Sequence, residues 1–169
     1  MNPGFLGDSY DLVKRFFCRE LVALQYEVVV DPMFTGTWGN RETQFYRLIG
    51  ATPKAVGAAP TAGTALFLDP DTGVDSNGGK QHVSCDRVVR EATTHELVFS
   101  FDQSFSRQAK PRDVMQAKLA AVSSCGGRAM YYDSHARFLF VSLKEHPLQE
   151  LREHLVSLGL PAERLLESR

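Results

Sequence analysis

The chain has 169 residues, of which 43% are hydrophobic and 23% charged, and these values fit one globular domain with a sizeable core. The formal net charge of −1 excludes a global positive field that would attract nucleic acid or an anionic membrane. No apolar run approaches the roughly 20 residues that a membrane helix needs, so we expect no membrane partner. The first residues lack the basic and apolar regions of a signal peptide, which favours a cytoplasmic location.

The chain carries none of the common cysteine- or glycine-containing motifs of metal, nucleotide or catalytic sites. Its three cysteines are far apart and odd in number, which argues against a disulfide framework and a cysteine zinc site. No glycine-rich phosphate loop, Gly-x-Gly-x-x-Gly fingerprint or Gly-x-Ser-x-Gly elbow occurs. The candidate chemistry therefore rests on other residues.

Hydrophobic periodicity predicts the helices and strands. A helix over 9–24 has one apolar stripe, with Lys14 expected on the opposite face, and Asp8 or Ser9 can cap its start. The remaining pattern predicts, in chain order, strand 26–30, helix 42–48, strand 64–68, helix 85–93, strand 96–101, helix 112–123, strands 129–132 and 137–143, and a helix that opens at His146 and ends at Gly159. Residues 50–63 are predicted to be a loop, 71–80 a mobile turn region, and 161–167 a short coda.

This alternation predicts a three-layer α/β fold of the Rossmann-like kind, formed as a single domain over residues 1–169. Helices that alternate with strands imply right-handed crossovers and helices on both faces of a mostly parallel sheet, here of about five strands. The strands 129–132 and 137–143 are expected to form a C-terminal β-hairpin that supplies an antiparallel edge. Sequence alone does not predict the oligomeric state.

Three carboxylates follow apolar, strand-like runs, and they mark the most informative pattern in the chain. Asp31, Asp69 and Asp102 each come directly after such a run, and Asp71 lies two residues beyond Asp69. Neighbouring strands lie roughly 4.8 Å apart, and ligands of open α/β sheets bind beyond the strand carboxyl ends. These side chains are therefore expected to meet at one sheet edge and to hold Mg²⁺ or Mn²⁺. Turn chemistry alone is the alternative explanation of Asp-Pro-Asp-Thr-Gly.

The leading functional hypothesis is a metal-assisted phosphoester hydrolase that acts on nucleic acid or a nucleotide. Asp31, Asp69, Asp71 and Asp102 would hold the metal, whose bound water would attack the phosphorus. Asp69 and Asp102 are therefore candidate catalytic residues. Arg107 would clamp the phosphate, although a solvated loop arginine is the alternative.

An aromatic loop follows the first strand at the same expected edge. Phe34, Gly36 and Trp38 lie in this loop, and Tyr46 follows in the next helix. Aromatic rings at a ligand site can stack a base or a sugar. These residues are therefore candidate cofactor-binding groups, with a role in covering the core as the alternative.

Two stretches resemble parts of a known family. Residues 7–15 and 28–36 resemble the opening of bacterial ribosomal RNA adenine methyltransferases, where a Gly-Asn-x-x-Asp-Val-x-Lys-His helix precedes a strand ending in Asp-Thr-His-Ala-Gly. Residues 66–70 are similar to the strand that ends in Asp-Pro-Pro-Tyr in those enzymes. They also resemble the Phe-Leu-Asp-Pro-Asp-Asn-Gly strand of uncharacterised bacterial and phage proteins.

The resemblance implies a second function, a methyltransferase-like domain, active or degenerate, that binds adenosylmethionine. Asp31 and the loop 34–39 would border the adenosylmethionine pocket, and Asp69-Pro70 would lie near the acceptor. The chain departs from the family in two places. The aromatic residue that ends Asp-Pro-Pro-Tyr is missing, because Asp71-Thr72 stands there instead. The stretch between Gly36 and the second strand is also too short to hold the further βα units of a full methyltransferase. A third hypothesis is a non-catalytic interaction protein.

Overall fold

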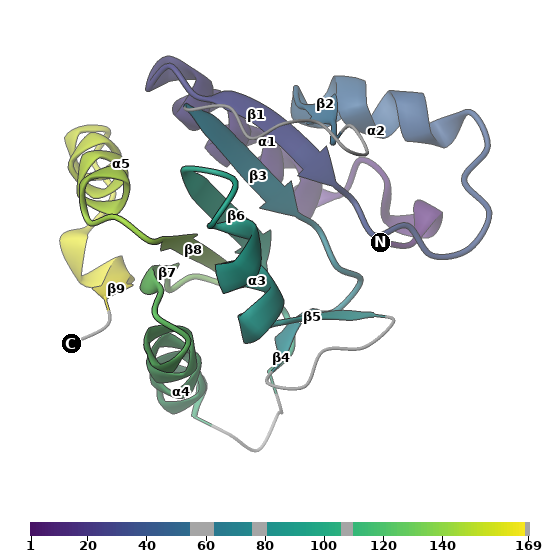
Figure 1. Ribbon diagram of the computed structural model, residues 1–169. Coiled ribbons are helices and arrows are strands. Elements are labelled where there is room, and N and C mark those ends of the chain that lie inside the picture. Colours follow the sequence, from purple (N-terminus) through teal and green to yellow (C-terminus); the bar gives the residue numbers. More distant parts are fainter. Residues whose placement is uncertain (55–62, 76–80, 106–109, 168–169) are drawn as a thin grey trace.

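The protein is an α/β structure built on a seven-stranded mixed sheet (Figure 1). The computed structural model describes residues 1–54, 63–75, 81–105 and 110–167. The strand order is β2-β1-β3-β6-β8-β7-β9, and β4 and β5 form a separate two-stranded sheet. The strand bounds are β1 Glu27–Asp31, β2 Thr52–Pro53, β3 Thr64–Leu68, β4 Gly73–Asp75, β5 His82–Ser84, β6 Leu97–Phe101, β7 Arg128–Tyr132, β8 Phe138–Ser142 and β9 Leu165–Glu167.

The sheet is mostly parallel, as predicted. β1, β2, β3 and β6 pair in parallel, and β8 runs antiparallel to both β6 and β7. The predicted hairpin of β7 and β8 is confirmed, but its predicted place at the sheet edge is wrong. β8 lies inside the sheet, and β9 pairs with β7 to form the outer strand.

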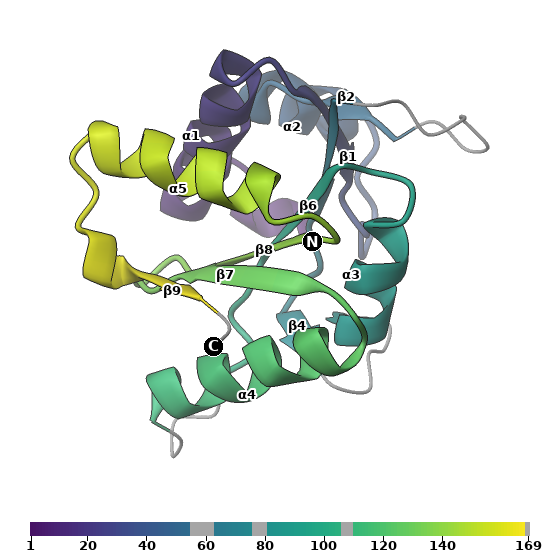
Figure 2. The same ribbon diagram turned by 60° about the vertical axis from the view of Figure 1, so that its left-hand side comes forward.

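Helices cover both faces of the sheet (Figure 2). α1, α2 and α5 pack on one face around Phe67 and Phe99, whereas α3 and α4 pack on the other around Leu66 and Val98. The neighbours in β3 face opposite layers because side chains alternate along a strand. The helix bounds are α1 Ser9–Ala23, α2 Arg41–Ile49, α3 Cys85–Glu91, α4 Pro111–Ser124 and α5 His146–Ser157, with 3₁₀ turns at Pro3–Phe5 and Ala162–Arg164.

The buried face of α1 differs from the predicted one. Asp8 caps the helix as expected, since its Oδ1 accepts from the N–H groups of Tyr10 and Asp11. However, Lys14 is 4% exposed and Asp11 is fully buried, whereas Leu12 is 57% exposed. The predicted outward position of Lys14 is therefore wrong, because two buried carboxylates hold its ammonium in the interior.

Several short elements lie outside the predicted ones. β2 falls in the predicted loop 50–63, β4 in the predicted turn region 71–80, and β9 in the predicted coda. Strands of two or three residues are too short to show an alternation of apolar and polar side chains. Among the described helices, none is long and apolar enough to cross a membrane.

Candidate functional site

The chain leaves the neighbouring strands β1 and β3 in opposite directions. After β1 it enters α2, on the face that α1 covers, and then pairs as β2 at the outer side of β1. After β3 it passes through β4 and β5 into α3, on the opposite face, and then enters β6. Open α/β sheets bind ligands at such a reversal, beyond the strand carboxyl ends. We call the segments 31–38 and 69–71 at these ends the switch point.

Met1 lies at the switch point and makes a dense set of polar contacts. Its amino group lies 2.9 Å from the carbonyl oxygen of Met33, 3.5 Å from that of Pro32 and 3.8 Å from a carboxylate oxygen of Asp71. Its carbonyl oxygen accepts from Thr35 N–H at 2.8 Å, Thr35 Oγ1 at 3.0 Å and Trp38 Nε1 at 3.2 Å. Acceptors thus surround the amino group and donors surround the carbonyl. We call these contacting groups the Met1 site.

A buried charge cluster lies next to the Met1 site. Lys14 Nζ donates to Asp69 at 2.9 Å and to Asp11 at 3.0 Å, and it lies 5.0 Å from the ring centre of Phe101. The Met1 sulfur is 3.8 Å from the same nitrogen. The Oδ1 atom of Asp69 is buried without a hydrogen-bond partner among the described residues. We call Asp11, Lys14 and Asp69 the Lys14 cluster.

Burial and charge balance set the protonation of the Lys14 cluster. Burial raises the pKa of Asp69 above its usual range, and this effect outweighs the opposing pull of Lys14. Burial alone would lower the pKa of Lys14, but the two carboxylates outweigh it and raise that pKa. Burial is thus the main reason why Asp69 favours its protonated form; the neighbouring Asp11 carboxylate adds a smaller effect in the same direction, and the ammonium groups of Lys14 and Met1 oppose it.

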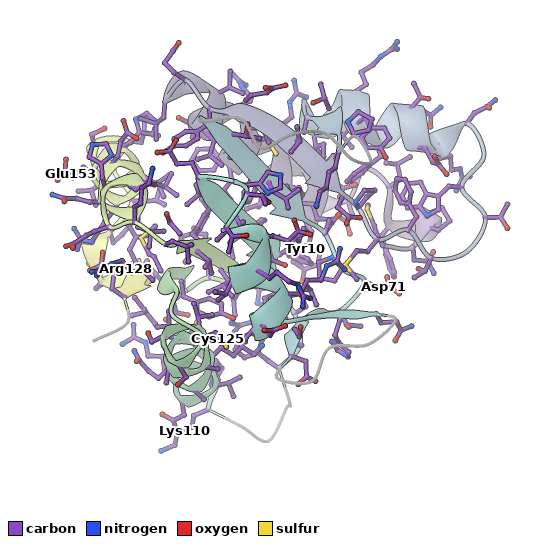
Figure 3. All side chains as sticks on the ribbon, viewed as in Figure 1. Tyr10, Asp71, Lys110, Cys125, Arg128 and Glu153 are labelled. Carbon is purple, nitrogen blue, oxygen red and sulfur yellow. The ribbon has the colours of Figure 1, made fainter. Side chains whose placement is uncertain are left out.

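A cavity of about 190 Å³ opens beside the Lys14 cluster. Asp11, Lys14 and Phe101 line it together with residues of the switch point. Tyr10 and Asp71, which also line it, are labelled in Figure 3. The complete lining is Met1, Asn2, Phe5, Asp8, Tyr10, Asp11, Lys14, Pro70, Asp71, Phe101 and Gln103. Polar and aromatic groups therefore face one small cavity at the strand carboxyl ends.

Asp31 and Asp102, the other two predicted metal ligands, each bind a cation of the chain. Asp31 pairs with Arg87 of α3 at 2.7 Å, and both side chains are about one-third exposed at 29% and 31%. Asp102 is fully buried and accepts from Lys118 Nζ at 2.6 Å and from Tyr131 Oη at 2.5 Å. It also accepts from the backbone N–H of Val74 and Ser104 and from the Ser104 hydroxyl.

With these partners, the three carboxylates are not arranged to bind one metal ion. The part of the chain that the structure describes holds no group of three or more His, Cys, Asp or Glu side chains that could bind a metal. Asp31, Asp69 and Asp102 each have a Lys or Arg partner instead. Arg107, the predicted phosphate clamp, lies outside the described residues.

The aromatic loop packs inward as well as bordering Met1. Phe34 and Trp38 lie 4.2 Å apart between ring centres and both contact Phe45. Trp38 is 4% exposed, so its ring covers the core while its Nε1 serves the Met1 site. Gly36 has a φ of +75°, a left-handed backbone conformation that lets the loop turn here.

Sequence reasoning missed four residues of this region: Met1, Asp11, Lys14 and Thr35. Asp11 and Lys14 are three residues apart, which places them one turn apart on one helix face, and this spacing was the available signal. Met1 and Thr35 carried no signal, because their roles arise only where the chain start meets the β1 loop.

Comparisons with protein-family models, curated proteins and solved structures found no match to this chain.

Proposed function

We propose that this protein is a methyltransferase-like domain that binds adenosylmethionine at the switch point. The observation that carries the proposal is the set of contacts around Met1. Acceptors face its amino group and donors face its carbonyl oxygen, so the region suits the amino-acid portion of a ligand. Adenosylmethionine carries such a portion, with an ammonium and a carboxylate.

Each side of the Met1 site matches one charge of this ligand. The carbonyl oxygens of Pro32 and Met33 and the carboxylate of Asp71 would bind the ammonium. The Thr35 N–H and hydroxyl and the Trp38 Nε1–H would donate to the carboxylate. Hydrogen bonds to charged groups are stronger than those to neutral groups, so a zwitterionic ligand gains more from these donors than a peptide carbonyl does.

The arrangement of the sheet is compatible with the kind of fold that an adenosylmethionine-binding domain would need. A mostly parallel sheet with a reversal between β1 and β3 is compatible with a Rossmann-like topology. The resemblance assigns the ligand to Asp31 and the loop 34–39, and Thr35 and Trp38 belong to that loop. Bound adenosylmethionine would supply a methyl group on a sulfonium, while the Lys14 cluster would keep Asp69-Pro70 fixed beside the cavity.

Metal-assisted phosphoester hydrolysis and a nucleic-acid or nucleotide partner stay predictions. The hydrolase would need Asp31, Asp69 and Asp102 to share one ion, whereas each now has a cation of the chain within 2.9 Å. The residues as placed do not fit Mg²⁺ or Mn²⁺, and we derive no step through a metal. A non-catalytic interaction protein remains the alternative if no ligand binds.

Calorimetry and thermal shift with adenosylmethionine and adenosylhomocysteine test the proposal. We expect both to bind, and ligand at 100 times its Kd should stabilise the fold by about 2.7 kcal/mol. Asp71→Asn should weaken binding at least about tenfold through the lost charge. Asp86→Asn, on an exposed carboxylate of α3, is the matched control and should bind normally.

Adenosine serves as the ligand control because it lacks the amino-acid portion, and it should bind more weakly than adenosylhomocysteine. The proposal fails if neither adenosylmethionine nor adenosylhomocysteine binds at millimolar concentration, both with Met1 in place and with Met1 replaced by glycine.

A further inference from the structure

Residues 1–7, which lead to the α1 N-cap residue Asp8, form a strap that is anchored at one end. Met1 is 4% exposed, whereas Phe5 is 62% exposed and none of the residues in the turn Pro3–Phe5 is buried. We infer that Met1 is a built-in occupant of the Met1 site, and that residues 1–7 must swing away before a ligand enters. The identity of that ligand rests on the proposed function, but the occupancy does not.

The anchor is the carbonyl group and side chain of Met1. Three hydrogen bonds from Thr35 and Trp38 converge on its carbonyl oxygen. Its side chain is buried in the same cluster as Phe45 and Trp38, and its sulfur lies beside Lys14 Nζ. Met1 therefore contacts the switch point through its backbone and also lines the cavity.

The rest of the strap has fewer described contacts, although the partly buried Leu6 packs against the core. Arg41 Nη1 donates to the carbonyl of Pro3 at 3.3 Å on the exposed surface. Gly7, the last residue of the strap, has a φ of +87°, and its Cβ position would meet no atom within 4 Å. A glycine in open space can change its backbone angles without a clash, so Gly7 is the pivot that the geometry provides.

Gly7 also connects the strap to the Lys14 cluster. Its N–H donates to Asp11 Oδ2 at 2.8 Å, while the other carboxylate oxygen of Asp11 accepts from Lys14. Because Asp11 and Lys14 belong to α1, strap release would leave their ion pair in place while it removes the Met1 sulfur from beside Lys14 Nζ. The ligand would meet a site that is already formed.

Competition between strap and ligand has a quantitative consequence. A ligand that binds only the open form has an apparent Kd equal to its intrinsic Kd divided by the open fraction. If the strap is closed nine-tenths of the time, loosening it strengthens apparent binding by about tenfold. The strap therefore sets the ligand concentration at which the site fills.

The test uses two variants of the 169-residue chain, Met1→Gly and Met1→Leu, each released from a removable N-terminal fusion so that residue 1 is its first residue. Glycine removes the buried side chain and weakens the anchor, while leucine keeps an apolar side chain of similar size. Trp38 is the single tryptophan, and its Nε1 contacts Met1, so its fluorescence reports strap position without any ligand. The added probes are L-methionine, adenosylmethionine and adenosylhomocysteine.

We expect Met1→Gly to change Trp38 fluorescence, to bind L-methionine at millimolar concentration, and to bind adenosylmethionine about tenfold more tightly than wild type. Met1→Leu should behave as wild type. Binding of L-methionine to Met1→Gly, without binding of either adenosyl ligand, would support the strap and overturn the proposed function. Equal adenosylmethionine binding by wild type and Met1→Gly would overturn the strap alone. No binding of any probe to Met1→Gly would overturn both.

Discussion

Asp69 and Asp102 follow the neighbouring parallel strands β3 and β6, and they form two instructive regions of the molecule. Both carboxylates are fully buried, and both pair with a lysine from a helix, Asp69 with Lys14 at 2.9 Å and Asp102 with Lys118 at 2.6 Å. In sequence the two positions carry the same signal, a carboxylate directly after a buried strand.

The carboxylates of Asp69 and Asp102 differ in how many hydrogen bonds their oxygen atoms accept. Asp102 accepts hydrogen bonds from Lys118, Tyr131 and Ser104 and from two backbone N–H groups, and so ties β4, β7 and α4 to the end of β6. Asp69 keeps one oxygen without a described partner, and its ion-pair partner Lys14 and its neighbour Pro70 line the cavity. A fully paired buried carboxylate stabilises structure, whereas an incompletely paired one near a cavity is the better candidate for function.

The largest expected loss of folding stability comes from removing the carboxylate of Asp102. Asp102→Ala leaves Lys118 without its ion-pair partner and removes the acceptor of Tyr131 and two backbone N–H groups. Loss of one partner of a buried ion pair costs about 3–5 kcal/mol. Urea denaturation at neutral pH measures this free energy of unfolding. A loss below about 1 kcal/mol would show that the Asp102 network contributes little, and would erase the contrast with Asp69.

A smaller loss is expected at Gly73, which passes close to Asp102. Its φ is +116°, and a Cβ there would lie 2.2 Å from Asp102 Oδ1 and 2.7 Å from the Gln103 nitrogen. Gly73→Ala should cost about 2–4 kcal/mol, through backbone strain combined with the clash. Gly126→Ala is the control, because Gly126 also has a positive φ but has open space around its Cβ position. Similar thermal-denaturation midpoints for the two variants would argue against close packing around Asp102.

The contrast also shows which parts of the molecule sequence could predict. β3 and β6 were predictable because every residue in them is buried, so each reads as a continuous apolar run. The hairpin of β7 and β8 was predictable from two apolar runs around a polar turn. β9 was not, since its three residues gain their strand geometry only by pairing with β7.

At the candidate site, the sequence indicated where the carboxylates follow the strands but not which residues they pair with. Asp69 and Asp71 follow β3, as the strand-end pattern predicted, and Asp71 lines the cavity. Nothing local indicated that Lys14 would reach Asp69 across 55 residues of chain, or that Arg87 would reach Asp31 across 56. Contacts of that range depend on the packing of α1 and α3 on the sheet, and no periodicity in the sequence encodes it.

Asp69→Asn should have a moderate effect that depends on pH. The variant removes one negative charge from the Lys14 cluster but keeps an oxygen acceptor, so it should cost at most about 1–2 kcal/mol. Because the pKa of Asp69 is raised in the folded state, the proton on Asp69 favours folding at low pH, and this contribution is lost as pH rises through the folded pKa. The cost of Asp69→Asn should therefore shrink as pH increases.

Denaturation curves of wild type and Asp69→Asn at a series of pH values above 4 measure this trend, with Asp86→Asn as the exposed control. A cost that grows with pH would mean that the ionised carboxylate is what stabilises the fold. Asp69 would then be a structural residue like Asp102, and the contrast between the two regions would disappear.

The smallest expected effect concerns the partly exposed pair of Asp31 and Arg87, which bears on the metal prediction. Arg87→Gln should change the free energy of unfolding by only about 0.2–1 kcal/mol, because solvent screens an exposed ion pair. The variant frees Asp31, one of the predicted metal ligands, without disturbing the Lys14 cluster. We expect Mn²⁺ titration to give no binding heat with either wild type or Arg87→Gln, since Asp69 and Asp102 keep their lysines. Binding heat with wild type that Asp69→Asn abolishes would instead support the metal site. Asp31 and Asp69 would then exchange their cations for the metal, and the incomplete pairing of Asp69 would be explained by a missing ion rather than by an organic ligand.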